Sequence, residues 1–119
     1  MRKWILLLAL CGVAEAGEKD FLHCFYFTPL EGATGADWKA FFAATDALQG
    51  KAQGLKHAWY GKLNRPMGSE PPRAWGVCMD FGKEDDFRSY ANSPVHANWE
   101  KAYFKVRQPG TTTTDFTGQ

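Results

Sequence analysis

The segment FLHCFYFT at residues 21–28 constrains the fold more than any other part of the chain. Successive side chains of a β-strand point to opposite faces of a sheet. Here both sets are large and mostly apolar, with Phe21, His23, Phe25 and Phe27 on one face and Leu22, Cys24 and Tyr26 on the other. A strand that needs burial on both faces lies inside a sheet, and Pro29 ends this one.

The rest of the chain supplies three more strands and two helical regions. A capping-box sequence at residues 34–37 precedes apolar residues at helical spacing, which predicts a helix that ends at Gly50. Residues 55–63, 74–81 and 111–116 have the patterns of strands, and residues 64–73 form a loop rich in Pro and Gly. The order β-α-β-β-α-β predicts an α+β, ferredoxin-like fold, a four-stranded antiparallel sheet with two helices on one face.

The second helical region, residues 84–104, holds a Tyr and a His that suggest a reaction. Pro94 interrupts it, because proline disfavours helical geometry at Ser93 and is accepted at the first position of a new helix. Ser93 then caps that helix, and His96 lies in its first turn, where the helix dipole favours neutral imidazole. The break can turn Tyr90 towards His96. We predict a candidate acid/base pair, with two half-buried core residues as the alternative.

Residues 1–16 have the pattern of a secretory signal peptide. Arg2 and Lys3 supply a positive start, residues 4–14 are apolar, and Ala14-Glu15-Ala16 is a small-x-small cleavage site. The apolar run is too short to span a bilayer comfortably, and an uncleaved anchor is the alternative. We expect cleavage after Ala16 and a single domain, residues 17–119, in a secreted or periplasmic location.

The charge of that mature domain excludes some partners. The sequence has 14 Lys and Arg and 13 Asp and Glu, and removal of Arg2, Lys3 and Glu15 leaves 12 of each. A neutral domain without a basic stripe has no electrostatic surface for nucleic acid or an anionic membrane. We therefore expect no nucleic-acid partner, and no membrane association once the signal peptide is removed.

Two cysteines, Cys24 and Cys78, remain after the predicted cleavage, in a compartment that would be oxidising. We interpret them as buried apolar residues, with a cross-strand disulfide as the alternative. Two thiols are too few for the usual thiolate metal site, and His23 points to the other face of the strand from Cys24. The sequence predicts no metal and no cofactor.

The sheet face that the helices do not cover would carry Leu22, Cys24 and Tyr26. An apolar face of this kind is usually covered by a partner. We expect a homodimer in which a second sheet packs on it.

Several short motifs follow one another in a recognisable order. They are His23 before an aromatic strand, Phe41-Phe42, Gly61-Lys62, Phe81, Glu84-Asp85-Asp86-Phe87, Tyr90, Ser93-Pro94-Val95-His96 and Asp115-Phe116. In their order and spacing the chain resembles the stress-responsive α/β-barrel domain family along nearly the whole mature chain. This resemblance implies a dimer whose two sheets form a barrel, with a pocket between helices and sheet in each subunit.

The same resemblance implies roles for individual residues. In the plant polyketide cyclases of this family, a His and a Tyr at the positions of His96 and Tyr90 are acid/base partners in an aldol closure. The departures are Ser93, which replaces the first His of the usual His-Pro-x-His motif, and Trp75 and Thr45, where a cyclase has more polar groups. The residues that would line the ligand pocket are His23, Phe41, Phe42, Val77 and Trp75.

Three functions are compatible with these observations. The first is a domain of uncharacterised role that binds a small apolar ligand. The second is a cofactor-free enzyme in which His96 removes a proton next to a carbonyl while Tyr90 donates to the developing oxyanion. The third is haem or monooxygenase chemistry involving His23 or His57, for which surface or core packing is the alternative.

Overall fold

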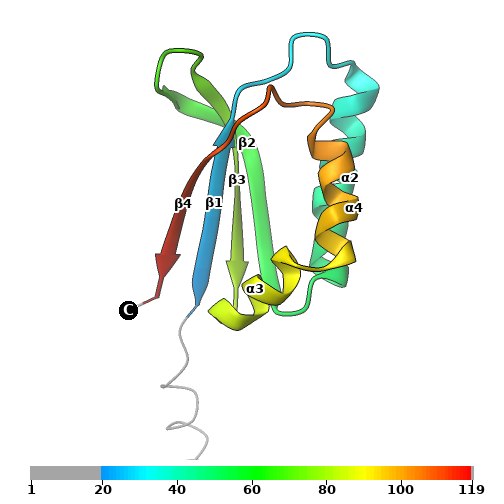
Figure 1. Cartoon of the computed structure of the whole chain (residues 1–119), viewed down its shortest axis with the longest axis vertical. Helices are drawn as coiled ribbons and strands as arrows, with labels where there is room; N and C mark the ends of the chain where they lie inside the picture. Colours follow the sequence, from blue (N-terminus) through cyan, green and yellow to red (C-terminus); the bar gives the residue numbers. More distant parts are fainter. Residues whose placement is uncertain (1–19, 119) are drawn as a thin grey trace, which may run out of the picture.

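The computed structural model describes residues 20–118, and the predicted signal peptide and its cleavage site lie outside them (Figure 1). The elements in chain order are β1 Phe21–Phe27, α2 Gly35–Lys51, β2 Leu55–Met67, β3 Arg73–Phe81, α3 Glu84–Ala91, α4 Pro94–Tyr103 and β4 Thr112–Thr117. The four strands form one sheet in the order β2-β3-β1-β4, and every neighbouring pair is antiparallel. The predicted α+β, ferredoxin-like fold is confirmed.

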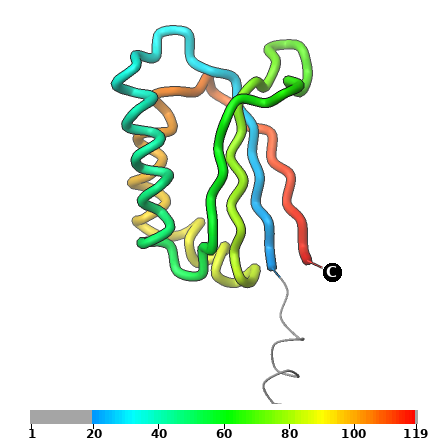
Figure 2. The backbone as a smooth tube through the Cα atoms, turned by 180° about the vertical axis from the view of Figure 1, so that it is seen from behind, coloured from blue at the N-terminus to red at the C-terminus, as the bar shows by residue number. Residues whose placement is uncertain are grey.

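The helices lie on one face of this sheet. Figure 2 shows α2 and α4 side by side along that face, and α3 crosses one end of the sheet in Figure 1. The strand predicted to be internal, β1, pairs with β3 on one side and with β4 on the other. Its aromatic side chains on the helical side, Phe25 and Phe27, are buried beneath the helices.

The break in the second helical region occurs where the sequence predicts it. Helix α3 ends at Ala91, and α4 begins with Pro94 at its first turn. The Ser93 hydroxyl accepts a hydrogen bond from the backbone N–H of His96 at 3.3 Å and donates one to the Tyr90 carbonyl at 2.7 Å. One side chain therefore caps the new helix and ties it to the end of the old one.

Helices α2 and α4 are joined through a buried polar contact. The Thr45 hydroxyl is fully buried, donates to the Phe41 carbonyl at 2.8 Å and accepts from the Trp99 indole N–H at 3.0 Å. At the start of α2 the predicted capping box is present, with Thr34 and Asp37 each bonded to the backbone of the other. The Thr45–Trp99 contact holds α4, which carries His96, against α2.

Strand β2 is longer than predicted. It continues to Met67 rather than ending at Leu63, because a shift in register after Lys62 lets Met67 pair with Arg73 of β3. Part of the expected loop at residues 64–73 therefore belongs to a hairpin that extends beyond the body of the sheet (Figure 1).

The two cysteines form a disulfide, so our preferred interpretation of two unlinked apolar residues is wrong. Cys24 and Cys78 lie directly opposite each other on β1 and β3, with their Cα atoms 4.0 Å apart. Both point to the sheet face away from the helices, where Cys24 is 2% exposed. The cross-strand bond was the weaker alternative because sequence alone does not give the register of the two strands.

The disulfide lies on the face that the helices leave open. Trp59 is 52% exposed there and Phe116 is 56% exposed, on β2 and β4 respectively. Tyr26 lies across Gly76, where an added Cβ would come within 2.8 Å of its ring. The result is a broad, partly aromatic surface on the side of the sheet opposite α2 and α4.

Across residues 20–118, the length and hydropathy of the helices do not suffice for a membrane span.

Candidate functional site

A cavity of about 170 Å³ lies between α4 and the β1–β4 side of the sheet. Helix α4 contributes His96, Trp99, Glu100 and Tyr103, and the connection after it contributes Phe104, Arg107 and Thr111. The strands contribute His23, Phe25 and Thr113. The lining thus combines aromatic rings with two imidazoles, a carboxylate and a guanidinium.

His23 enters this cavity from the centre of the sheet. Its Nδ1 lies 2.6 Å from Oδ1 of Asp115, which faces it from the paired strand β4. The imidazole also packs against the ring of Phe87, with centroids 4.4 Å apart. A carboxylate only accepts hydrogen bonds, so the contact assigns the proton to Nδ1 and leaves Nε2 as the acceptor in neutral His23.

His96 faces the same cavity from the first turn of α4. Burial lowers the pKa of its imidazole below the ordinary value, the carboxylate of Glu100 opposes this, and the nearby His23 adds to it. The Nδ1 of His96 lies 3.8 Å from Oε1 of Glu100, one turn further along the helix. The result is an imidazole that is neutral at pH 7, as the sequence predicts from its place beside a helix N-terminus.

Tyr90 lies behind His96. The two rings meet edge to face with centroids 5.0 Å apart, so the predicted proximity of Tyr90 and His96 is present. Tyr90 is 5% exposed, and it is not among the residues that line the 170 Å³ cavity. Its hydroxyl is buried and has no hydrogen-bond partner within residues 20–118, and burial raises its pKa above the ordinary value.

The aromatic residues predicted to line a ligand pocket instead fill the space between helices and sheet. Phe41 and Val77 are core residues, 0% and 1% exposed. Phe42 stacks on Trp75 and Tyr60, with centroid distances of 5.9 and 5.0 Å. Of the five predicted ligand-binding residues, the structure brings only His23 to the cavity that holds His96, and the ligand-binding roles stay predictions.

Three charged residues of the site were missed by the sequence prediction. Glu100 lies four residues after His96, a spacing that places two side chains on the same side of a helix, and this signal was available. Asp115 was noted only as part of a closing motif, and its contact with His23 spans 92 residues. Arg107 carries no local signal, because it follows the end of α4 in an irregular segment.

The two histidines considered for haem chemistry do not share a site. His57 lies on the open face of the sheet and packs against Trp59, with ring centroids 4.3 Å apart. His23 lies on the helical face and is bonded to Asp115. Between residues 20 and 118, no group of three or more His, Cys, Asp or Glu side chains could hold a metal ion.

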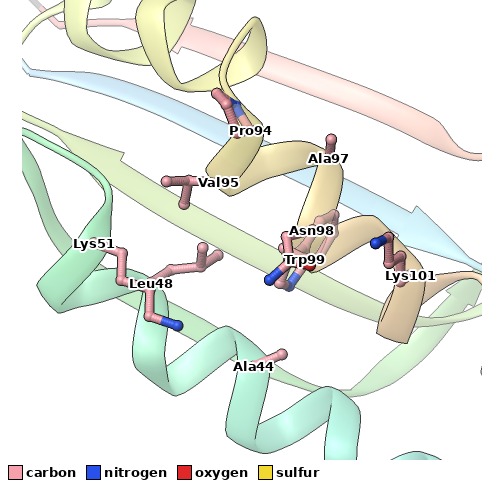
Figure 3. A pocket seen from close by; sticks show the side chains of 9 residues that line it. All are labelled: Ala44, Leu48, Lys51, Pro94, Val95, Ala97, Asn98, Trp99 and Lys101. Atoms are coloured by element: carbon pink, nitrogen blue, oxygen red, sulfur yellow. The ribbon is translucent and has the colours of Figure 1, made fainter.

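A second hollow, of about 520 Å³, lies on the outer surface between α2 and α4. Figure 3 shows it with side chains of α2 on one side and of α4 on the other. Its floor includes Leu48 and Trp99, and Lys51 and Lys101 lie in its lining. It contains none of the predicted site residues.

Comparisons with known proteins support the fold. No family model and no curated protein matches the sequence. A hydroxynitrile lyase from Passiflora edulis has a TM-score of 0.70 at 14% identity, over 85% of this chain and 94% of its own. A dabb family protein with a ferredoxin-like fold from Mesorhizobium loti has a TM-score of 0.66 at 15% identity, and the match covers 85% of this chain and 98% of that protein. A dimeric ferredoxin-like protein of unknown function from Thermobifida fusca has a TM-score of 0.65 at 18% identity, and the match covers 83% of this chain and 91% of that protein.

At these identities the similar structures show the fold of the chain. They include a dabb family protein and a protein described as dimeric, which agrees with the resemblance of the sequence to the stress-responsive α/β-barrel family. One of them is an enzyme and another has no assigned function. A fold that carries several functions leaves the function of this chain to its own site.

Proposed function

We propose that this chain is a stress-responsive α/β-barrel protein that binds a small molecule in the cavity between α4 and the sheet. The observation that carries the proposal is the convergence of two imidazoles, His23 and His96, on one cavity of about 170 Å³. They come from opposite sides of that space, one from the sheet and one from a capped helix. Each has its own carboxylate neighbour, which restrains its orientation.

The size and lining of the cavity limit the ligand. Pockets for drug-sized molecules have about 300–1,000 Å³, so this ligand is smaller. An engineered apolar cavity of about 150 Å³ in another protein holds benzene, so one ring is a suitable size. Phe25, Trp99 and Tyr103 supply aromatic surface for such a ring. A small ring or chain with an apolar body and one or two polar groups fits this space.

A second candidate function is cofactor-free acid/base catalysis. His96 is neutral at pH 7 and can remove a proton from a carbon next to a carbonyl, while the Nε2 of His23 can accept or relay one. The hydroxyl of Tyr90, which has no hydrogen-bond partner among the described residues, lies beside His96 and supplies a donor for a developing oxyanion if a ligand or a ring movement brings the two together. The lyase among the similar structures supports this reaction class by analogy.

We further propose that the protein is a homodimer. The open sheet face carries exposed Trp59 and Phe116, which a second sheet would cover. The dimeric ferredoxin-like protein from Thermobifida fusca supports this arrangement. The Cys24–Cys78 bond supports the proposed secreted or periplasmic location, because disulfides persist in oxidising compartments.

The ligand-binding function can be tested without knowing the ligand. The mature protein, purified from its natural compartment under native conditions, is analysed by mass spectrometry for retained small molecules. We expect a compound that is present in the wild type and depleted in His96→Ala and His23→Ala. His57→Ala is the matched control, because it removes an imidazole from the other face of the sheet. Equal retention by all three variants would place the ligand elsewhere.

Catalysis requires a separate readout. The compound is added to His96→Ala at concentrations high enough to offset its weaker binding, and loss of conversion under these saturating conditions would support the acid/base function. Conversion at the wild-type rate by that variant would reject His96 as the base.

A further inference from the structure

We infer that the ligand of the 170 Å³ cavity carries a carboxylate group, which Arg107 binds. This inference rests on the proposed ligand-binding function and names the chemical class of the ligand. It follows from the surroundings of Arg107 in the cavity lining.

Arg107 is held in place at the cavity. Its backbone forms a β-bridge with Pro29. Its guanidinium lies over the rings of Tyr103 and Phe104, with its central carbon 5.0 and 4.5 Å from their centroids. Its Nη1 donates to the Thr111 hydroxyl at 3.2 Å. A guanidinium fixed on two aromatic rings is already oriented for a ligand, so little side-chain freedom is lost on binding.

The remaining donors of this guanidinium are unused. Its Nε is buried and has no hydrogen-bond partner among residues 20–118. No acidic side chain in this part of the chain forms an ion pair with it. By contrast, Arg88 pairs with both Glu84 and Asp85 on the surface of α3. A buried, positively charged donor without a partner is costly, and a bound anion removes that cost.

Part of the guanidinium is available to a carboxylate. Nη1 donates to Thr111, and Nη2 forms no hydrogen bond with residues 20–118, so Nη2 is the donor left for a ligand. Nε is enclosed by the protein, and a small shift of the side chain would bring its N–H beside that of Nη2, as a parallel pair that matches the two oxygens of a carboxylate. The one acidic residue in the cavity lining, Glu100, lies towards the other end, 3.8 Å from His96. An anionic group therefore fits at the Arg107 end, and the rest of the ligand extends over Phe25 and Trp99 towards the imidazoles.

These constraints define a class of compounds. The ligand is a small carboxylic acid, with a body about the size of one ring and a carboxylate at Arg107. Its far end would lie beside His96 and His23, where a hydroxyl or carbonyl group would find hydrogen-bonding partners.

Benzoate and benzamide test the inference directly, because they have nearly the same shape and differ in charge. Each is titrated into the ¹⁵N-labelled wild-type protein while the Arg Nε–H and His ring resonances are followed by NMR. We expect benzoate to shift the signals of Arg107 and His96 and to bind about tenfold or more tightly than benzamide. In Arg107→Gln that preference should disappear.

Two further variants control for charge and folding. Arg88→Gln removes the same charge from the surface and should keep the preference for benzoate. Arg107→Lys keeps the charge but loses the paired donors, and it should weaken benzoate binding even if Arg107→Gln does not fold. Equal binding of benzoate and benzamide at the imidazoles of the wild type would overturn the carboxylate inference and leave the ligand-binding function standing. Absence of any shift with either probe at millimolar concentration would count against both.

Discussion

His23 and Asp115 face each other across the paired strands β1 and β4, with Nδ1 of the imidazole 2.6 Å from Oδ1 of the carboxylate. The contact joins the centre of the sheet to its edge at the wall of the cavity. Because the Asp115 carboxylate accepts a hydrogen bond from Nδ1–H of His23, the other ring nitrogen, Nε2, is left as a hydrogen-bond acceptor. The carboxylate thus acts on the site by fixing a tautomer.

Replacement of Asp115 should therefore change the tautomer of His23. In Asp115→Ala we expect a shift from the Nδ1–H form towards the Nε2–H form, which is visible in the ring ¹⁵N chemical shifts. Loss of this charge-assisted hydrogen bond should also lower the free energy of unfolding by about 1 kcal/mol. His57, on the other face of the sheet, should keep its spectrum. An unchanged His23 spectrum would show that Asp115 does not set the tautomer.

The Ser93 hydroxyl should matter for binding as well as for stability. Ser93→Ala removes the cap of α4 and the bond to the Tyr90 carbonyl, so we expect a loss of about 1 kcal/mol in urea unfolding. Thr34→Ala removes the corresponding cap of α2, at a residue that is not among those lining the cavity, and should cost about as much. Only the Ser93 variant should bind benzoate more weakly. Equal binding by both variants would show that the helix break does not organise the cavity.

The parts of the fold that could be predicted from sequence have local causes. The burial of both faces of β1 follows from its alternating side chains, and the start of α4 follows from Ser93-Pro94. The end of β2 could not be predicted in this way, because its last residue pairs with Arg73 only after a shift in register. The disulfide has the same dependence, since a slip of one residue would turn Cys24 and Cys78 to opposite faces.

The site was predicted in part for the same reason. The place of His96 is set by the cap beside it, and its proximity to Tyr90 follows from the helix break. Asp115 reaches His23 only through the pairing of the first and last strands. The aromatic pattern identified Phe41 and Val77 as inward-facing, but it could not show whether the space between them is filled. In the structure they are closely packed core residues.

The Cys24–Cys78 bond should be a major source of stability. It closes a loop between residues 54 positions apart, and its loss relaxes a constraint on the unfolded chain. We expect Cys24→Ser combined with Cys78→Ser to lower the free energy of unfolding by about 2–4 kcal/mol. The measurement is urea unfolding, with and without reductant. Reductant should destabilise the wild type but leave the double variant unaffected, and equal stability of both proteins under oxidising conditions would contradict this.

The open sheet face should hold the dimer together. Trp59→Glu places a charge at an exposed aromatic position of β2 on that face, and we expect a folded monomer in light scattering coupled to size-exclusion chromatography. Leu30→Glu is the control, since Leu30 is exposed in the connection between β1 and α2 and lies outside the sheet. A Trp59 variant that remains dimeric at micromolar concentration would assign the interface to another surface.

The buried imidazole of His96 should make the fold sensitive to acid. Its pKa is lowered by burial in the folded protein, so the unfolded chain binds the proton more readily. The stability from neutral His96 is therefore complete above the ordinary His pKa of about 6.5, and it declines as pH falls from there through the lower folded pKa. In His96→Gln we expect a smaller loss of unfolding free energy between pH 7 and pH 5 than in the wild type.

Glu100 and His23 also face the His96 ring, and Glu100→Gln separates the effect of the carboxylate from that of His23. Without the carboxylate, folded His96 should be even harder to protonate than in the wild type. The loss of unfolding free energy in Glu100→Gln should persist and begin at the same pH as in the wild type. An identical slope in the wild type and in His96→Gln would show that His96 titrates with its ordinary pKa and is exposed to solvent.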